Sequence, residues 1–225
     1  MTAMKEQDNS LTERPETLAV LPKERFTTVY RLAQRLSCLL FHTLYPVRYH
    51  GLEWAQINAP FILICNHYSM LDPFIVAWKC ARYQIFFLGK KELEGHPLLK
   101  WLLNQLHMIP IDRHNMDMAA IRACLTTLKE GHPLGFFPEG TRHKQGTMQD
   151  LESGVAFLAL RANVPLLPVF ISEKPRWFRI INCYFSKPIT FEKLIDAGVN
   201  KSNCEKLLDL IRERYQQFAI AEKGP

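Results

Sequence analysis

Short apolar runs rich in β-branched and aromatic residues alternate along this chain with segments whose apolar residues recur at helical spacing. Composition and run length predict strands at 60–66, 84–89, 108–111, 134–138, 166–171 and 180–185. Helical spacing predicts helices at 70–82, 97–106, 116–130, 150–162 and 202–221. This alternation predicts one α/β domain with a mixed, mostly parallel sheet and helices on both faces. Working residues are then expected where strands end and loops begin.

The N-terminal 45 residues have a different pattern. Residues 1–22 show no apolar periodicity, which predicts a mobile arm. Residues 23–45 place aromatic and aliphatic side chains at helical spacing and carry four basic residues, Lys23, Arg25, Arg31 and Arg35, so this segment is predicted to be an amphipathic helix. Two interpretations stay open: the helix packs on the domain core, or it lies in the membrane interface.

The composition indicates a globular protein and argues against several other classes of protein. A hydrophobic content of 48% with 22% charged residues in 225 is typical of a globular domain. Apolar runs such as 61–65 are far shorter than the roughly 18 residues that cross a bilayer, so no spanning helix is expected. The mixed polar N-terminus does not resemble a signal peptide, and a cytoplasmic location is expected. Six scattered cysteines without a C-x-x-C pair predict buried thiols and no metal site.

The charge indicates an anionic partner without identifying it. Lys and Arg number 28 against 22 Asp and Glu, which gives a formal net charge of +6. A positive protein of this kind attracts phosphate groups, anionic lipid or nucleic acid. One basic and aromatic stretch, 174–179 (KPRWFR), is what a lipid-surface or nucleic-acid binding module would use.

The first candidate for chemistry is the segment 66–72 (NHYSMLD), where a predicted buried strand gives way to a helix. Positions five apart diverge on a continuous helix, so His67 and Asp72 can meet only if a turn intervenes. Ser69 resembles a helix N-cap and supplies that turn. The carboxylate would then fix the imidazole tautomer, and the other ring nitrogen would be available to take a proton from a hydroxyl. The alternative is that Asp72 caps the helix and His67 is an ordinary loop residue.

Further polar residues follow other predicted strands. In 136–142 (FFPEGTR), Gly140 frees the backbone beside Glu139 and Arg142, and the guanidinium matches a phosphate. Arg113 ends the run 108–111, and Lys90 and Lys91 follow 84–89 in the same way. A doubly wound sheet would bring these bases to one edge beside His67. The alternatives are a surface ion pair and charges that simply end strands at the solvent boundary.

Two prolines flank the apolar residues of 164–169 (VPLLPV). Proline is hard to place in a central strand, so Pro165 and Pro168 predict an edge, a bulge or the wall of a groove suited to an acyl chain. A rigid turn into a strand explains them equally well.

Taken in order, N-H-x-x-x-x-D, the run ending at Arg113, P-E-G-T-R and V-P-x-x-P-V resemble the four motifs of the glycerolipid acyltransferase family, closest to its 1-acyl-sn-glycerol-3-phosphate acyltransferases. The resemblance makes residues 46–225 an acyltransferase domain with that family's fold. It implies that His67 is the general base and that Asp72 orients it. It also implies substrate-binding roles for the residues that follow: Lys90, Arg113, Glu139, Gly140, Thr141, Arg142, Pro165 and Pro168.

The same resemblance implies a reaction and its partners. A fatty acyl group would pass from acyl-CoA or acyl carrier protein to the sn-2 hydroxyl of lysophosphatidic acid, giving phosphatidic acid in phospholipid biosynthesis. No cofactor, no metal ion and no nucleic acid are implied. The lipid substrate makes 23–45 the candidate for peripheral attachment to the inner face of the membrane.

Two positions depart from the family pattern, and the alternatives they leave concern the acceptor and the activity itself. Tyr68 stands where Gln is frequent, and Glu152 stands where a basic residue often precedes Gly154. An acyltransferase for another lysophospholipid or lipid acceptor therefore stays open. So does a non-enzymatic module that binds anionic lipid, although such a module gives no reason for His67 and Asp72 to share this turn.

Overall fold

The computed structural model describes residues 28–80, 82–112, 118–140, 148 and 151–223. Within these residues one sheet has the strand order β1-β7-β6-β2-β5-β3-β4. The strands are β1 (Val47–His50), β2 (Ile62–Cys65), β3 (Phe86–Lys90), β4 (Ile109–Ile111), β5 (Leu134–Phe136), β6 (Leu166–Ile171) and β7 (Ile181–Phe185). Neighbouring strands are parallel except for the antiparallel pair β6–β7. The predicted mixed, mostly parallel sheet is therefore confirmed.

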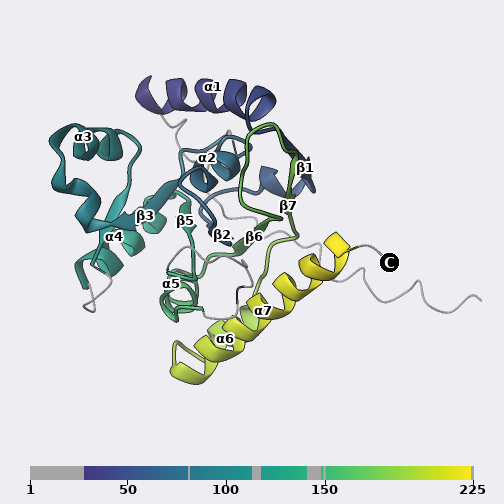
Figure 1. The fold of residues 1–225 in the computed structure, drawn as a ribbon. Helices are drawn as coiled ribbons and strands as arrows, with labels where there is room; N and C mark the ends of the chain where they lie inside the picture. Colours follow the sequence, from purple (N-terminus) through teal and green to yellow (C-terminus); the bar gives the residue numbers. More distant parts are fainter. Residues whose placement is uncertain (1–27, 81, 113–117, 141–147, 149–150, 224–225) are drawn as a thin grey trace, which may run out of the picture.

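Helices cover both faces of this sheet because the side chains of the central strands alternate between two cores. Ile62 and Ile64 of β2 belong to a core shared with α4 (Met118–Lys129), α5 (Gly154–Ala162) and α7 (Lys201–Lys223). Leu63 and Cys65 belong to the opposite core, which includes α1 (Thr28–Thr43) and α2 (Asp72–Ala77). Figure 1 shows α1 and α2 on one side of the sheet and α7 on the other. The predicted two-sided α/β architecture is confirmed.

Shorter helices connect these layers. They are α3 (Pro97–Gln105), α6 (Glu192–Asp196) and the 3-10 helices η1 (Trp54–Gln56) and η2 (Lys91–Gly95). The sequence pattern did not predict β1 or α6, because a four-residue edge strand and a five-residue helix are too short to show a period. Helix α2 is shorter than the predicted 70–82, since it begins at Asp72, after the turn that holds His67, and ends at Ala77.

The strand pairing corrects the interpretation of 164–169 as an edge strand. Strand β6 is interior, paired with β2 on one side and β7 on the other. The carbonyl of Pro168 accepts from the Ser186 N–H, so the missing proline N–H faces the same side, just beyond the end of β7. No ladder hydrogen bond to β2 is lost there. Pro165 precedes β6, and its carbonyl accepts from the Ile62 N–H, which fits a rigid turn into a strand.

The predicted N-terminal arm, 1–22, and the first residues of the predicted helix 23–45 lie outside the described residues. The described part of that helix is α1, which runs from Thr28 to Thr43. Among the helices of the described chain, none is both long and apolar enough to cross a membrane.

Candidate active site

The site begins where β2 ends, at the central strand of the sheet. Asn66 is fully buried, and its side-chain amide donates to the Ile171 carbonyl and accepts from the Ile171 N–H, both at 2.8 Å. These two bonds replace a pair of backbone ladder bonds to β6 just past the last residue of β2. The main chain of the next residues can then leave the sheet plane. Asn66 therefore fixes the point at which His67 turns away from the strand.

Asp72 organises the turn that follows. Its Oδ2 lies 2.9 Å from His67 Nδ1 and 2.6 Å from the backbone nitrogens of Tyr68 and Ser69. Its Oδ1 accepts from the Ser69 hydroxyl at 3.0 Å. The carboxylate is fully buried, while the His67 side chain is 13% exposed. Backbone and hydroxyl donors thus hold a buried charge at the position where it can orient an imidazole.

The predicted His67–Asp72 pair is therefore present in the geometry. A carboxylate can only accept, so Nδ1 carries the proton and Nε2 presents its lone pair. Among the described residues Nε2 has no hydrogen-bond partner, and His67 lies on the wall of a cavity. This is the arrangement that general-base catalysis requires.

Ser69 does not cap α2 in the predicted way. The helix begins at Asp72, and the Ser69 hydroxyl accepts from the Leu71 N–H at 3.1 Å while donating to the Asp72 carboxylate. The backbone N–H groups of Tyr68 and Ser69 are also used by Asp72, so they cannot serve an oxyanion. Within this described turn, the Met70 N–H is left without an acceptor among the described residues.

Glu139 ties the turn after β5 to the turn after β2. Its side chain is 7% exposed; Oε2 accepts from the His67 N–H at 3.1 Å and Oε1 accepts from the Met148 N–H at 3.0 Å. Strands β2 and β5 are adjacent and parallel, so their carboxyl ends lie side by side. Glu139 therefore acts on the position of His67 through the backbone, across 72 residues of sequence.

Gly140 has a φ of +66°, and a Cβ there would lie 2.0 Å from Glu152 Oε1. The backbone conformation favours glycine, whereas the exposed end of the Glu152 side chain can move aside. The exposed Glu152 carboxylate lies against Gly140, and the Glu152 backbone N–H donates to the Pro138 carbonyl at 2.8 Å. The acidic residue that departs from the family pattern is thus part of this site.

Aromatic rings extend the site away from the two carboxylates. The His67 ring stacks on Phe137 at 4.2 Å between centroids, and Phe137 lies 5.8 Å from Phe87 in a parallel arrangement. Gly135 makes room for Phe87, since a Cβ there would lie 2.2 Å from that ring. Sequence reasoning assigned no role to either phenylalanine. Their sequence pattern indicates core residues, because it takes the pairing of β5 with β2 to bring Phe137 to His67 and the pairing of β3 with β5 to bring Phe87 to Phe137.

A cavity of about 630 Å³ opens beside this stack. Its wall is mostly apolar and comes largely from α1, α2, β3 and α3, and its ionisable residues are Tyr30, His67 and Lys90. Lining residues include Ala33 and Ser37 of α1, Phe74 of α2, Phe87 and Lys90 of β3, and Leu102 of α3. A pocket of this size and lining is typical of a site for a small apolar ligand with a few fixed polar groups.

The predicted site residues divide into three groups. His67, Asp72, Glu139 and Gly140 are brought together, and Lys90 lies on the same cavity as His67. Pro165 and Pro168 are not among the described residues that line this cavity, and their substrate-binding role stays a prediction. Arg113, Thr141 and Arg142 lie outside the described residues. The strand before Arg113 does pair with β3, with Ile111 opposite Lys90.

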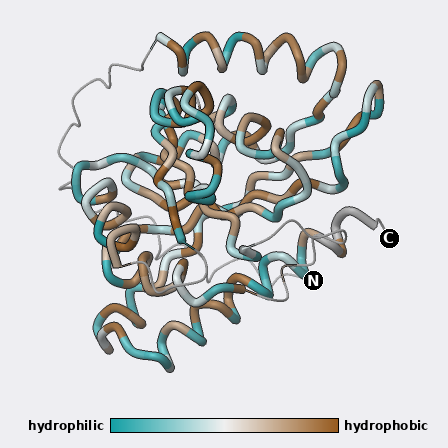
Figure 2. The backbone as a smooth tube through the Cα atoms, turned by 60° about the vertical axis from the view of Figure 1, so that its left-hand side comes forward, coloured by the Kyte–Doolittle hydropathy of each residue, from teal (hydrophilic) through white to brown (hydrophobic). Residues whose placement is uncertain are grey.

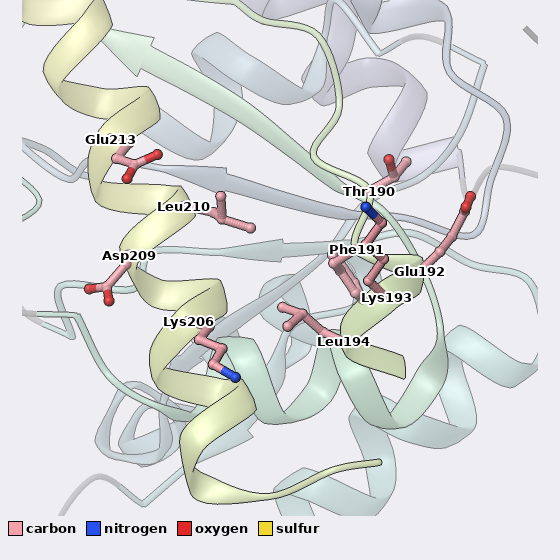
Figure 3. Close-up of a pocket in the computed structure, with 9 residues that line it drawn as sticks. All are labelled: Thr190, Phe191, Glu192, Lys193, Leu194, Lys206, Asp209, Leu210 and Glu213. Carbon is pink, nitrogen blue, oxygen red and sulfur yellow. The ribbon is translucent and has the colours of Figure 1, made fainter. Parts of the chain in front are cut away.

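A second depression, of about 470 Å³, lies between α6 and α7 (Figure 3). Leu210 of α7 points toward Phe191, and charged residues of both signs, among them Lys206 and Glu213, surround it. It contains none of the predicted site residues. In the described part of the chain, no three His, Cys, Asp or Glu side chains converge as metal ligands, and the expectation of no cofactor stays a prediction.

Comparison with known proteins identifies sequence relatives of this chain. A 1-acyl-sn-glycerol-3-phosphate acyltransferase of Limnanthes douglasii is 33% identical over 171 residues, 74% of this chain and 60% of that protein. One from Bacillus subtilis is 30% identical over 122 residues, 54% of this chain and 60% of that protein. The chain thus spans about 60% of the length of these curated relatives.

The crystal structure of the 1-acyl-sn-glycerophosphate (LPA) acyltransferase PlsC from Thermotoga maritima has the same fold, with a TM-score of 0.62 at 20% identity. The match covers 85% of this chain and 78% of that one. The sequence profile of the family described as Acyltransferase matches residues 46–172, a range that contains the turns after β2 and β5 as well as β6. The chain belongs to the acyltransferase family.

Proposed function

We propose that this protein transfers a fatty acyl group from acyl-CoA or acyl carrier protein to the sn-2 hydroxyl of lysophosphatidic acid, giving phosphatidic acid. The observation that carries the proposal is the His67–Asp72 pair, whose Nε2 lacks a partner among the described residues, on the wall of an apolar cavity. The activity named for the relatives in Limnanthes and Bacillus supports the same reaction.

His67 acts as the general base. Nε2 takes the proton of the acceptor hydroxyl as the hydroxyl oxygen attacks the thioester carbonyl, and Asp72 stabilises the imidazolium that forms. The tetrahedral intermediate collapses, the carbon–sulfur bond breaks, and the proton passes from the imidazolium to the leaving thiolate. The products are the new ester and a free thiol.

The oxyanion of that intermediate needs a hydrogen-bond donor. The Met70 N–H is the best backbone candidate, since its neighbours Tyr68 and Ser69 donate to Asp72. Met70 also lies on the cavity wall with His67.

Lys90, Arg113 and Arg142 bind the acceptor phosphate, and Glu139, Gly140 and Thr141 shape that subsite. Support comes from Lys90 on the cavity of His67 and from the pairing of β4, which leads to Arg113, with β3. The acyl chain occupies the cavity between α1, α2, β3 and α3, whose lining is largely aliphatic and aromatic. The donor, CoA or carrier protein, is the remaining choice.

Another lysophospholipid is the second candidate acceptor, and Glu152 favours it. Its carboxylate packs against Gly140, in the turn that leads to Arg142. A negative charge there opposes a phosphate monoester more strongly than a phosphodiester, because the monoester carries the larger negative charge. Comparing the two acceptors in one assay separates the candidates.

The enzyme works as a peripheral protein on the inner face of the membrane, attached through the amphipathic helix predicted at 23–45. Its described part, α1, has a cavity-facing side and an exposed leucine side, so one helix contacts both substrate and surroundings.

The test measures thiol release from a long-chain acyl-CoA, with and without lysophosphatidic acid. We expect acceptor-dependent release from the wild type and a loss of at least about a hundredfold in His67→Ala. His50→Ala is the matched control, because this histidine lies on β1, outside the lining of the cavity. Release that needs no acceptor would indicate a thioesterase. If no thiol is released from acyl-CoA or from acyl carrier protein, the interpretation that remains is a non-enzymatic module that binds anionic lipid.

A further inference from the structure

The loop between β6 and β7 exposes large apolar side chains that the proposed chemistry does not use. Trp177, Phe178 and Ile180 are 65%, 70% and 56% exposed. In the sequence they alternate with three exposed basic residues, Lys174, Arg176 and Arg179. A soluble surface seldom concentrates rings in this way unless the patch contacts something.

The backbone of this loop holds a ring outward at an energetic cost. Phe178 has a φ of +58°, a left-handed conformation that bulky residues rarely adopt. Its N–H donates to the Leu44 carbonyl at 2.8 Å, which maintains the conformation. A strained residue whose side chain packs little on the protein indicates that the exposed ring has a use.

The same contacts join the loop to α1. Leu44 directly follows the C-terminal part of α1, and the Trp177 ring lies 6.1 Å from that of Tyr45 in an edge-on arrangement. Figure 1 shows the β6–β7 loop rising to the end of α1. The two segments, far apart in sequence, therefore present one continuous surface.

Helix α1 contributes a leucine stripe to that surface. Leu32, Leu36 and Leu39 are 56%, 57% and 64% exposed and share one side of the helix at the i, i+4, i+7 spacing. The exposed Arg35 flanks the stripe. Figure 2 shows hydrophobic and hydrophilic residues alternating along α1 at the outer edge of the molecule. The opposite side of α1, with Ala33 and Ser37, lines the cavity of His67.

The charge pattern selects the occupant. In the described part of the chain Lys174, Arg176 and Arg179 form no ion pair, so their positive charge is available to an anionic partner. Rings and aliphatic side chains beside bases, on a convex loop and a helix face, suit a lipid headgroup layer, where rings sit at the interface and bases meet phosphates.

We propose that the loop 174–180 and the outer side of α1 form one docking face for an anionic phospholipid bilayer. The loop is a second membrane-contact site beside α1, and together the two segments hold the cavity wall at the membrane surface. A lipid chain can then pass beneath α1 toward His67 without crossing water. This extends the proposed function by naming the surface from which its substrate arrives, but docking is measured without substrate, so each idea can fail alone.

The test uses the full chain and vesicles containing phosphatidylglycerol with bromine-labelled acyl chains, which quench tryptophan fluorescence on contact. We expect quenching in the wild type and loss of most of it in Trp177→Phe, with the bound fraction nearly unchanged. The partly buried Trp54 and Trp78 remain as internal references, and the exposed Trp101 is replaced by Phe in both proteins. Equal quenching in wild type and Trp177→Phe would overturn the loop contact.

A second pair of variants measures the contribution of the patch. Trp177→Ser with Phe178→Ser should weaken vesicle affinity by at least about tenfold. Neutralising Lys174, Arg176 and Arg179 to Gln should weaken it by about fivefold per charge on anionic vesicles and little on neutral ones. Ile220→Ser, an equally exposed residue on α7 across the sheet, is the control and should change nothing. Unchanged vesicle binding in both loop variants, with lost binding to an acidic acyl carrier protein, would assign the loop to a protein partner instead.

Discussion

The turns that follow β2 and β5 lie side by side, and each is built around a buried carboxylate. The Asp72 carboxylate makes its hydrogen bonds within its own turn, to Tyr68, Ser69 and His67, which all lie within five residues of it. Glu139 instead contacts His67 and Met148, which are 72 and 9 residues away. One carboxylate sets the chemistry of the imidazole, and the other sets where the imidazole stands.

This difference teaches how to separate the two roles. A group that shares a proton with the base should affect the rate of the chemical step. A group that only fixes the backbone of the base should affect rate through position and should also affect stability, because it joins segments that are distant in sequence. The variants below test that distinction, from the largest expected effect to the smallest.

Asp72→Asn should reduce acyl transfer most. The amide keeps an oxygen acceptor but no charge, so it no longer favours the productive imidazole tautomer or stabilises the imidazolium. By analogy with other histidine–carboxylate pairs, kcat should fall by about 10³- to 10⁴-fold. The KM for the acceptor should stay nearly constant, measured by thiol release with lysophosphatidic acid varied. A loss below tenfold would show that Asp72 is merely a structural ligand of the turn.

Glu139→Gln should reduce kcat less and stability more visibly. Gln presents one oxygen and one NH₂ group to two backbone donors, so one N–H loses its acceptor. Leaving a buried donor unsatisfied costs about 1–3 kcal/mol in unfolding free energy. We expect a kcat loss of about ten- to a hundredfold and a lower urea midpoint. The shape of the pH–rate profile should be retained, because the base and its partner are unchanged. An altered profile would place Glu139 in the proton transfer.

Gly140→Ala tests whether the turn after β5 needs its conformation. The left-handed backbone costs an alanine about 1–2 kcal/mol, and the new Cβ must also displace the Glu152 carboxylate. Gly198→Ala is the matched control, with a φ of +78° and open space around the new Cβ. Both variants should lose stability in urea unfolding. Only Gly140→Ala should raise the KM for the acceptor, and equal kinetics in the two would separate this turn from substrate binding.

Glu152→Lys should have the smallest effect on the fold and a selective effect on the acceptor. The side chain is exposed, so unfolding free energy should change by no more than about 0.5 kcal/mol. Replacing a negative charge by a positive one beside Gly140 should lower the KM for lysophosphatidic acid by a few-fold at low salt and less at high salt. Glu192→Lys on α6 makes the same net charge change away from the site and serves as control. A KM that responds equally to both would reflect net charge alone.

Several parts of this molecule could be read from sequence for identifiable reasons. The runs that became β2, β3, β5, β6 and β7 are short and strongly apolar, so their positions followed from composition. Strand β1 did not, since its residues are half exposed and occur at an edge. The His67–Asp72 pair could be predicted from the sequence because both partners lie in one local segment with a serine turn between them. The sequence does not predict Pro168 in an interior strand, because an interior strand accepts a proline there only if β7 ends before it would need the missing N–H.

The sequence by itself determined the alternating order of elements, the local turn that joins His67 to Asp72, and the family that its motifs resemble. These depend on neighbours within a few residues, where spacing fixes geometry. The tertiary structure alone decided that Glu139 holds the His67 backbone and that Phe137 stacks on the His67 ring. It also decided that Pro165 and Pro168 are not among the described lining residues of the cavity. It also decided that the 174–180 loop meets the end of α1. Strand order determines all of these contacts, and strand order is set by how apolar faces pack across the whole chain rather than by any single segment.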